Sequence, residues 1–454
     1  MWCHVTLSSC LFIALSSVCV LSSNKPFHGH KVLRIKPTSY EQVKTLTDLE
    51  HDLKLDFWHL PHVDNDHMDV RVAPEFVEHL NNTLTKLKLD FEELIGDVQV
   101  LVDRETKSNR KRRAIRELED YTKHFLSYNE INAFLFEIAN VVPTAELINI
   151  NKTYELRDTY VIKLGTPMGS WKPAILIDAG IHAREWIAPA TAINFIYQLA
   201  INPTRDADIT DLLRKFDFYI APIVNADGYE HSRSSTSNRL WRKNRSHAAN
   251  SNCIGVDINR NFGYEWNPAA GGSSQPCSDL FSGGYEFSEP ESRNLRNFML
   301  SKKPDIKGYL TLHSYGLYWL YPWGYSDTAT AVDDNKLSAI ARTSVNAMSE
   351  QYTIGASAKV LYVAAGGSDD YAKAVAGIPY SYTVELPPSS STYNGFILSE
   401  STIPDVAQDT LKGLKAYAYS INDYITPTAT TTTTSAAPSY YWGPYRPWWQ
   451  SFFG

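Results

Sequence analysis

The chain has 454 residues, of which 43% are hydrophobic and 12% aromatic, so it is long enough for a large core and two or three domains. Its formal net charge is −7 at pH 7, and its basic residues form no long run of the kind that duplex nucleic acid requires. The composition therefore indicates a globular protein and argues against nucleic acid as a partner.

Residues 1–23 form an apolar segment that ends in small residues, the pattern of a cleaved secretory signal peptide. A membrane anchor is the alternative, but the apolar run is shorter than the ~20 residues that a span needs. Three of the five cysteines lie in this segment, so Cys253 and Cys277 remain and are expected to form one disulfide. We therefore expect a secreted, extracellular protein without a stable membrane span.

Three sequons could carry glycans, although so short a pattern often arises by chance: Asn81, Asn151 and Asn244.

The first domain alternates predicted strands and helices. In chain order, the apolar patterns predict a strand at 31–35, a helix at 39–53, strands at 55–60 and 68–73, a helix at 74–89 and a strand at 98–102. This βαββαβ order is that of a ferredoxin-like α+β domain.

The stretch 103–120 is charged and has no apolar period, which predicts an exposed segment. It contains four consecutive basic residues at 110–113, a good substrate for a dibasic or trypsin-like protease. The alternative is a solvated basic linker that is never cut. Because the segment joins two domains of a secreted chain, we favour cleavage.

The second domain alternates apolar runs with helical patterns. The runs predict strands at 160–164, 174–180, 216–225, 308–314 and 380–386, and the periodicity predicts helices at 188–201 and 405–425. Such alternation indicates an α/β domain, in which functional sites lie at the carboxyl ends of the strands.

Beyond residue 424 the composition changes to a Thr-rich run followed by a tip rich in Tyr, Trp and Phe. The Thr run cannot bury apolar surface, so residues 425–454 are expected to form a disordered linker and an aromatic tail. The aromatic side chains could contact a glycan or matrix partner, or fold back onto the body of the protein.

Two segments at predicted strand ends carry metal-binding residue types. His182 and Glu185 form an H-x-x-E pair directly after the run 175–180, and His313 follows the run 308–312. Imidazole and carboxylate groups bind Zn²⁺, and a catalytic zinc usually has three protein ligands. Alone, the H-x-x-E pair is common by chance and His313 would more often be a core histidine. Glu385 follows another apolar run, where a carboxylate is unfavourable unless it is paired or catalytic.

With these residues in view, the chain resembles, over residues 24–424, the zymogens of secreted zinc metallocarboxypeptidases of the pancreatic carboxypeptidase A/B type. The resemblance implies a mixed twisted sheet flanked by helices at 114–424, preceded by a ferredoxin-like α+β pro-domain at 24–113. It depends on seven motifs in the family's order: HAREW (182–186), NRLWRKNRS (238–246), CIGVDINRNF (253–262), LHSYG (312–316), YPWGY (321–325), AAGGSDDY (364–371) and TVEL (383–386).

The resemblance implies that His182, Glu185 and His313 bind one Zn²⁺ ion, and that Asp257 holds the ring of His182. Glu385 would be the general base, and Arg242 would stabilise the oxyanion together with zinc. The substrate-binding residues implied in the same way are Arg184, Arg239, Asn259, Arg260, Ser314, Tyr315, Tyr362 and Asp369.

Asp369 matches the floor of the side-chain pocket, which is acidic in B-type enzymes and apolar in A-type enzymes. A buried carboxylate there favours a C-terminal Lys or Arg on the substrate. The alternative is an A-type enzyme that releases aliphatic or aromatic residues, because the segment from Gly367 to Glu385 is one residue longer than the family's usual spacing.

The resemblance also implies that cleavage near Arg113 by an activating protease releases the pro-domain from the active-site cleft. The partners would be peptide or protein C-termini, and we expect a monomer. A competing hypothesis is a catalytically silent homologue that binds peptide C-termini and, through its tail, glycans.

Overall fold

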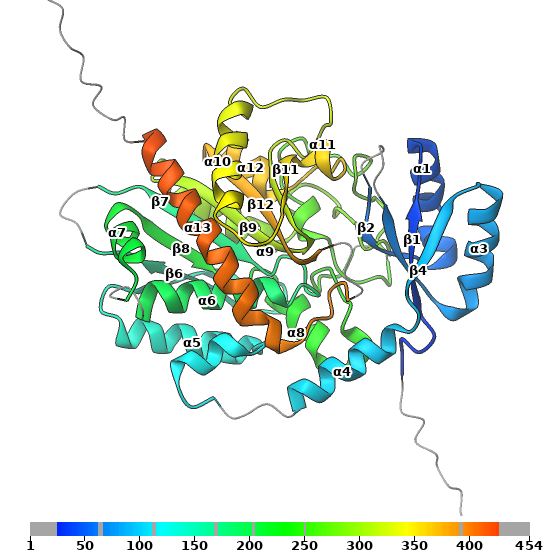
Figure 1. The fold of residues 1–454 in the computed structure, drawn as a ribbon, viewed down its shortest axis with the longest axis horizontal. Helices are drawn as coiled ribbons and strands as arrows, with labels where there is room; N and C mark the ends of the chain where they lie inside the picture. The colour runs from blue at the N-terminus through cyan, green and yellow to red at the C-terminus, as the bar shows by residue number, and fades with distance from the viewer. Residues whose placement is uncertain are drawn as a thin grey trace, which may run out of the picture.

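The computed structural model describes residues 25–61, 67–110, 115–167, 171–201, 205–248, 251–389 and 394–425. The predicted signal peptide, the cleavage residue Arg113 and the tail beyond residue 425 lie outside the described residues. Figure 1 shows a smaller unit, in blue, beside a larger unit, with α4 running along the lower edge from the smaller unit toward the larger one.

The smaller unit is a four-stranded antiparallel sheet of strand order β2-β3-β1-β4 with helices packed on it. This arrangement confirms the predicted ferredoxin-like domain. Its elements are β1 (Lys31–Lys36), α1 (Tyr40–Asp48), α2 (Glu50–Leu53), β2 (Asp56–His59), β3 (Met68–Val72), the 3₁₀ turn η1 (Pro74–Phe76), α3 (Val77–Lys86) and β4 (Asp90–Ile95).

The last strand predicted for this domain was wrong in position. Residues 98–102 begin helix α4 (Val98–Arg110), and the last strand is β4 instead. Val98 and Val102 are buried one helical turn apart, whereas Val100 between them is 45% exposed, so the apolar residues follow the helical period rather than the strand period. Helix α4 also extends into the stretch that was predicted to be exposed, where it buries Glu105.

The larger unit contains an eight-stranded mixed sheet of order β11-β10-β12-β9-β7-β8-β6-β5. Its elements are η2 (Leu118–Lys123), α5 (Tyr128–Val141), β5 (Glu146–Lys152), β6 (Asp158–Leu164), β7 (Ala174–Ala179), α6 (Ile187–Ile201), α7 (Ala207–Lys215), β8 (Asp217–Ala221), α8 (Ala226–Ser234), η3 (Thr236–Asn238), η4 (Ile258–Arg260), α9 (Pro290–Ser301), β9 (Ile306–Gly316), β10 (Tyr318–Tyr321), α10 (Asp334–Asn346), β11 (Thr353–Ala356), α11 (Ser357–Val360), α12 (Ser368–Ala374), β12 (Tyr380–Ser389), η5 (Glu400–Thr402) and α13 (Ile403–Ile425).

Helices cover both faces of this sheet, which confirms the predicted α/β class. Helices α6, α10 and α13 share one apolar core with one face of the sheet, and α9 and α12 share a second core with the other face; α13 crosses in front of the sheet in Figure 1. Strand β7 is apolar on both sides, because Ile175 and Ile177 enter the first core while Leu176 enters the second. The strands that carry the predicted site residues are therefore held rigidly from both faces.

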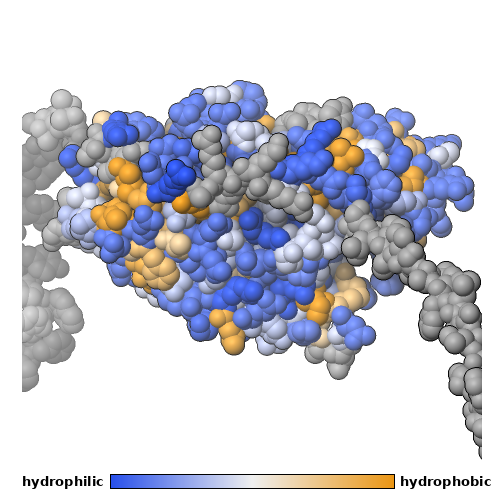
Figure 2. Space-filling view, turned by 90° about the horizontal axis from the view of Figure 1, so that it is seen from below, coloured by the Kyte–Doolittle hydropathy of each residue, from blue (hydrophilic) through white to orange (hydrophobic). Residues whose placement is uncertain are grey.

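The described residues contain one disulfide and present a mainly hydrophilic face in Figure 2. Cys253 and Cys277 form the predicted disulfide, with their Cα atoms 5.1 Å apart. Within the described ranges, no helix combines the length and the apolar character needed to span a membrane. The face in Figure 2 is mainly hydrophilic, and its hydrophobic patches are small and separate.

Candidate active site

Three neighbouring parallel strands position the central residues of the site. Strands β7, β9 and β12 are adjacent, with Ala179 opposite Leu312 and His313 opposite Glu385. His182 follows the end of β7 by three residues, so it lies beside His313 at the same edge of the sheet. Strands β9 and β12 continue to Gly316 and Ser389, so His313 and Glu385 lie inside these strands near their carboxyl ends rather than after them.

Three potential metal ligands converge at this edge. The Nδ1 atoms of His182 and His313 lie 3.2 Å apart. Glu185 lies between them, with Oε1 2.7 Å from Nδ1 of His182 and Oε2 3.1 Å from Nδ1 of His313. All three side chains are buried, and their donor atoms lie within 4.8 Å of one another. The structure thus brings the predicted ligand set together at one point.

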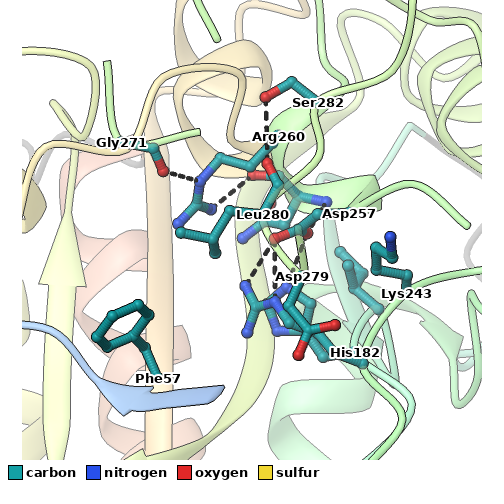
Figure 3. Close-up of polar contacts among 12 residues, drawn as sticks. Phe57, His182, Lys243, Asp257, Arg260, Gly271, Asp279, Leu280 and Ser282 are labelled. Atoms are coloured by element: carbon teal, nitrogen blue, oxygen red, sulfur yellow. Dashed lines mark hydrogen bonds and ion pairs between the residues drawn. The ribbon is translucent and has the colours of Figure 1, made fainter. Parts of the chain in front are cut away.

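These donors fit a zinc ion. Two imidazole nitrogens and a carboxylate form a donor set typical of catalytic zinc, which keeps a further position open for water or substrate. The predicted contact to Asp257 is present, since Nε2 of His182 lies 3.1 Å from Oδ1 of this buried carboxylate (Figure 3). This contact turns Nδ1 of His182 toward the other two donors.

Asp257 also binds the arginine that was predicted to act in catalysis. Nε and Nη2 of Arg242 donate to Oδ2 of Asp257 at 3.0 and 2.8 Å. Burial opposes ionisation of Asp257, but Arg242 and His182 outweigh it and hold the pKa of the carboxyl well below its usual value. Asp257 therefore stays charged and fixes two functional side chains at once.

Glu385 faces the same space from β12. Burial raises its pKa to about 8, although the positive charges of His313 and Arg242 favour ionisation. A carboxylate whose pKa lies near neutrality can accept a proton and return it, which suits a general acid–base role.

One cavity joins most of the predicted residues. In Figure 3, Phe57 on β2 of the smaller unit, drawn as a blue ribbon, faces this space from the side opposite Asp257 and His182. The predicted residues that line the cavity are His182, Glu185, Arg242, Asn259, Arg260, His313, Ser314, Tyr315, Tyr362, Asp369 and Glu385.

The arginine predicted to bind a substrate carboxylate is held in place by backbone groups. Nε of Arg260 donates to the carbonyl of Gly271 at 2.7 Å, as Figure 3 shows, and Nη1 donates to the carbonyl of Asn259 at 2.9 Å. Nη2 lies 3.4 Å from the hydroxyl oxygen of Tyr362. Because Asn259 and Tyr362 line the same cavity, the three groups could receive one carboxylate together.

Two adjacent carboxylates at the start of α12 have different surroundings. Asp369 lines the cavity, and burial raises the pKa of its carboxyl group. Asp370 instead accepts hydrogen bonds from the backbone N–H groups of Gly324 and Tyr325 at 2.9 to 3.0 Å. Asp370 therefore anchors the neighbouring loop, while Asp369 is the acid that faces the cavity.

Two predicted substrate residues do not line the cavity but bind the smaller unit. Nη1 of Arg184 donates to Oδ1 of Asp56 at 2.7 Å. Nε and Nη2 of Arg239 form a bidentate pair with Glu105 of α4 at 2.6 and 3.0 Å. Both arginines are buried by these contacts. In this structure the smaller unit occupies both arginines. Their role in substrate binding stays a prediction, and it applies to the chain after the smaller unit has been removed.

The smaller unit also enters the cavity itself. Phe57, Trp58 and His59 of β2 line it together with Leu60. Trp58 contacts Phe396 of the larger unit, with ring centroids 5.4 Å apart. These contacts place β2 over the candidate active site.

The two remaining predicted substrate residues lie between the metal ligands and the smaller unit. The backbone N–H of Ser314 donates to Oε2 of Glu185 at 3.2 Å, and the hydroxyl of Tyr315 donates to Asp69 of β3 at 3.1 Å. Tyr315 thus connects the cavity wall to the smaller unit.

Sequence reasoning missed a buried acid behind the metal ligands. Asp178 of β7 accepts hydrogen bonds from the hydroxyls of Tyr309 and Thr311 on β9 at 2.5 and 2.7 Å. Burial raises its pKa to about 6. The signal was available, because Asp178 is a carboxylate inside the apolar run 175–180.

Comparisons with known proteins agree with this geometry. A model of the zinc carboxypeptidase family matches residues 131–413, and a model of the carboxypeptidase activation peptide matches residues 33–105. The chain belongs to the zinc carboxypeptidase family. It is a metallocarboxypeptidase, and His182, Glu185 and His313 form its candidate zinc site.

Relatives of both named types resemble this carboxypeptidase. Carboxypeptidase B of Astacus astacus is 40% identical over 311 residues, covering 67% of this chain and 99% of the relative. Carboxypeptidase A2 of Rattus norvegicus is 36% identical over 410 residues, covering 88% and 95%. The crystal structure of carboxypeptidase A from Helicoverpa armigera has a TM-score of 0.80 at 30% identity, covering 87% of this chain and 98% of that chain. The resemblance thus extends over both units, and the match to the activation peptide falls on the ferredoxin-like unit.

Proposed function

We propose that this carboxypeptidase is a secreted zymogen whose active form releases Lys or Arg from the C-termini of peptides and proteins. The observation that carries the specificity is the buried carboxylate of Asp369 at the cavity. Among the described residues it forms no ion pair with a lysine or arginine. Because an unpaired buried carboxylate is unfavourable, a cationic substrate side chain is the partner that this position favours.

Removal of only the last residue follows from the groups around Arg260. The guanidinium of Arg260, with Asn259 and Tyr362, would bind the terminal carboxylate of the substrate. A peptide that continues beyond this point has no carboxylate there and would leave the guanidinium unpaired.

The hydrolytic step assigns a separate task to each remaining group. When bound by His182, Glu185 and His313, zinc supplies a Lewis acid that polarises a carbonyl and lowers the pKa of water. Glu385 takes a proton from the attacking water and donates it to the leaving amine nitrogen. Arg242, fixed to Asp257 through Nε and Nη2, keeps Nη1 for the oxygen on which negative charge develops.

The smaller unit would keep the enzyme inactive until an activating protease cuts near Arg113. Its strand β2 lines the cavity, and Asp56 and Glu105 bind Arg184 and Arg239. Burial opposes ionisation of Asp56, but Arg184 and Arg71 outweigh it and lower the pKa of this carboxyl group. The contact therefore stays ionic at neutral pH.

The test uses the full chain treated with trypsin and a panel of peptides that differ only in the last residue. We expect bound zinc and release of a C-terminal Lys or Arg in preference to Leu or Phe. Preferred release of Leu or Phe would establish the A-type alternative. Bound zinc without release of any residue would support a silent peptide-binding homologue. Elution as a single copy on size exclusion would support the proposed monomer.

A further inference from the structure

The three sequons differ sharply in what their asparagines do in the fold. Asn244 is fully buried, and its Nδ2 donates to Oε2 of Glu289 at 2.7 Å and to Oε2 of Glu291 at 3.0 Å. A glycan attached to this nitrogen would have to occupy the space of the two carboxylates. The folded chain therefore excludes a glycan at Asn244.

Asn81, on a helix of the smaller unit, is also a poor candidate for glycan attachment. It lies in α3 and is half-buried, and its Oδ1 atom is enclosed without a hydrogen-bond partner. A glycan here would also leave with the smaller unit after activation. Asn81 therefore serves as a control site rather than as the main candidate.

Asn151 is the sequon asparagine that the fold presents to solvent. It is exposed near the end of β5, where its backbone has φ of 109°. Its Oδ1 accepts a hydrogen bond from the N–H of Lys152 at 2.8 Å, which leaves the Nδ2 nitrogen for modification. The sequon hydroxyl of Thr153 is buried and donates to Asp227 at 2.6 Å, so the modification must precede folding of this segment.

A groove beside Asn151 offers a place for sugar rings. It is a shallow groove between β5 and α9 that is open to solvent. Apolar side chains could pack against the faces of the rings, and amide and hydroxyl groups could bind their hydroxyls. The partly or fully exposed groove residues that could take these two roles are Ile148 and Ile150, and Asn297 and Ser301.

We propose that Asn151 carries an N-linked oligosaccharide whose first sugars lie in the groove between β5 and α9. This inference rests on the proposed secretion of the chain. The oligosaccharide donor is a lipid diphosphate-linked sugar of the secretory pathway. The Nδ2–C1 bond forms, the bond between C1 and the diphosphate oxygen breaks, the lipid diphosphate leaves and the amide nitrogen loses one proton.

The position gives the glycan a physical role. Strand β5 is at the edge of the eight-stranded sheet, so one side of it has backbone groups that no strand of the sheet pairs. An exposed edge can pair with a second chain, and natural proteins cover or blunt such edges. A glycan at Asn151 covers the carboxyl end of this edge. The active site lies on β7, β9 and β12, separated from β5 by β6 and β8, so the glycan leaves it accessible.

The experiment expresses the full chain in a eukaryotic secretory host and maps glycopeptides of the protein in the medium. We expect a glycan on Asn151 and an unmodified Asn244. The variant N151G should lose the mobility shift of that glycan while keeping the peptidase activity after trypsin treatment. Glycine is chosen because it adopts a φ of 109° without strain, and N81Q is the matched control that should keep the shift.

The role of the groove has its own measurement. Trimming the glycan of the native chain to its first sugar should leave the unfolding temperature unchanged, whereas N151G should lower it by a few degrees and increase association at high concentration. Equal stability of all three samples would overturn the placement in the groove. An unmodified Asn151 or a modified Asn244 in folded, active protein would overturn the assignment. A chain that stays in the cell without any glycan would overturn both this inference and the proposed secretion, whereas the peptide panel tests the hydrolytic function separately.

Discussion

Replacing Asp369 with Asn tests whether this residue selects basic C-terminal side chains. Asparagine has nearly the same shape and can still accept the hydrogen bond that Thr383 gives to the Asp369 side chain. The substitution therefore removes the charge while leaving the cavity and its hydrogen bonding in place. Any change in preference then reports on the carboxylate itself.

The size of the effect follows from the burial of Asp369, which is only 6% exposed. A solvent-exposed ion pair contributes about 0–1 kcal/mol, whereas removing one partner of a buried charge pair costs about 2–5 kcal/mol. Since about 1.4 kcal/mol corresponds to a factor of ten in rate, D369N should lower kcat/KM for a C-terminal Arg by about 30-fold to several thousand-fold. The value for a C-terminal Leu should stay within a few-fold.

The assay compares two peptides that differ only in a terminal Arg or Leu, on D369N and on D370N after identical activation. Asp370 has the same side chain and is next in sequence, but it binds the backbone of Gly324 and Tyr325. We therefore expect D370N to lower stability more than it changes the Arg-to-Leu ratio. An unchanged ratio in D369N, or an equal change in both variants, would refute the reasoning.

Three other predictions concern catalysis, pH and inhibition. E385Q should lower kcat by about 10²–10⁴-fold while metal analysis finds zinc unchanged, because Glu385 is not a ligand; lost zinc would contradict its role as a base. Because burial raises the pKa of Asp369, this acid is neutralised at a higher pH than an ordinary Asp. As the pH falls, KM should therefore rise for a substrate that ends in Lys but not for one that ends in Leu. The same dependence of KM on pH for both substrates would contradict this prediction. E105Q leaves Arg239 without its buried charged partner, at a cost of about 3–5 kcal/mol. After cleavage, the smaller unit should therefore separate from the larger unit on size exclusion more readily in E105Q than in the chain with Glu105. Equal retention in the two proteins would show that this pair adds little.

The course of the chain through both sheets could be predicted largely from apolar patterns, and the exception is instructive. Residues 98–102 are almost entirely apolar, as a buried strand would be, yet they begin a helix whose Val98 and Val102 are buried in an apolar cluster formed by both units. The true strand, β4, is an edge strand with exposed Glu92 and Glu93, so it lacks the apolar character on which a strand prediction depends. The period of a five-residue run is too short to separate the two cases.

The site was predictable where its residues lie near the carboxyl ends of strands, and not where it depends on contacts between distant segments. His182, His313 and Glu385 each sit beside an apolar run, so their convergence follows from the parallel order of β7, β9 and β12. The pairs of Arg184 with Asp56 and of Arg239 with Glu105 join residues more than a hundred positions apart. No local pattern marks such a pair, because each partner alone looks like an ordinary surface charge.

The position of Glu105 and Asp56 before the basic run at 110–113 has a thermodynamic consequence. A cut at Arg113 would leave the described contacts of Asp56 and Glu105 intact, so with respect to these contacts it would convert an intramolecular complex into a bimolecular one. A short tether acts like a partner at about millimolar concentration, and that advantage disappears when the tether is cut. Freshly cut enzyme should therefore reach a higher final activity when diluted than when concentrated, because the released fraction obeys mass action.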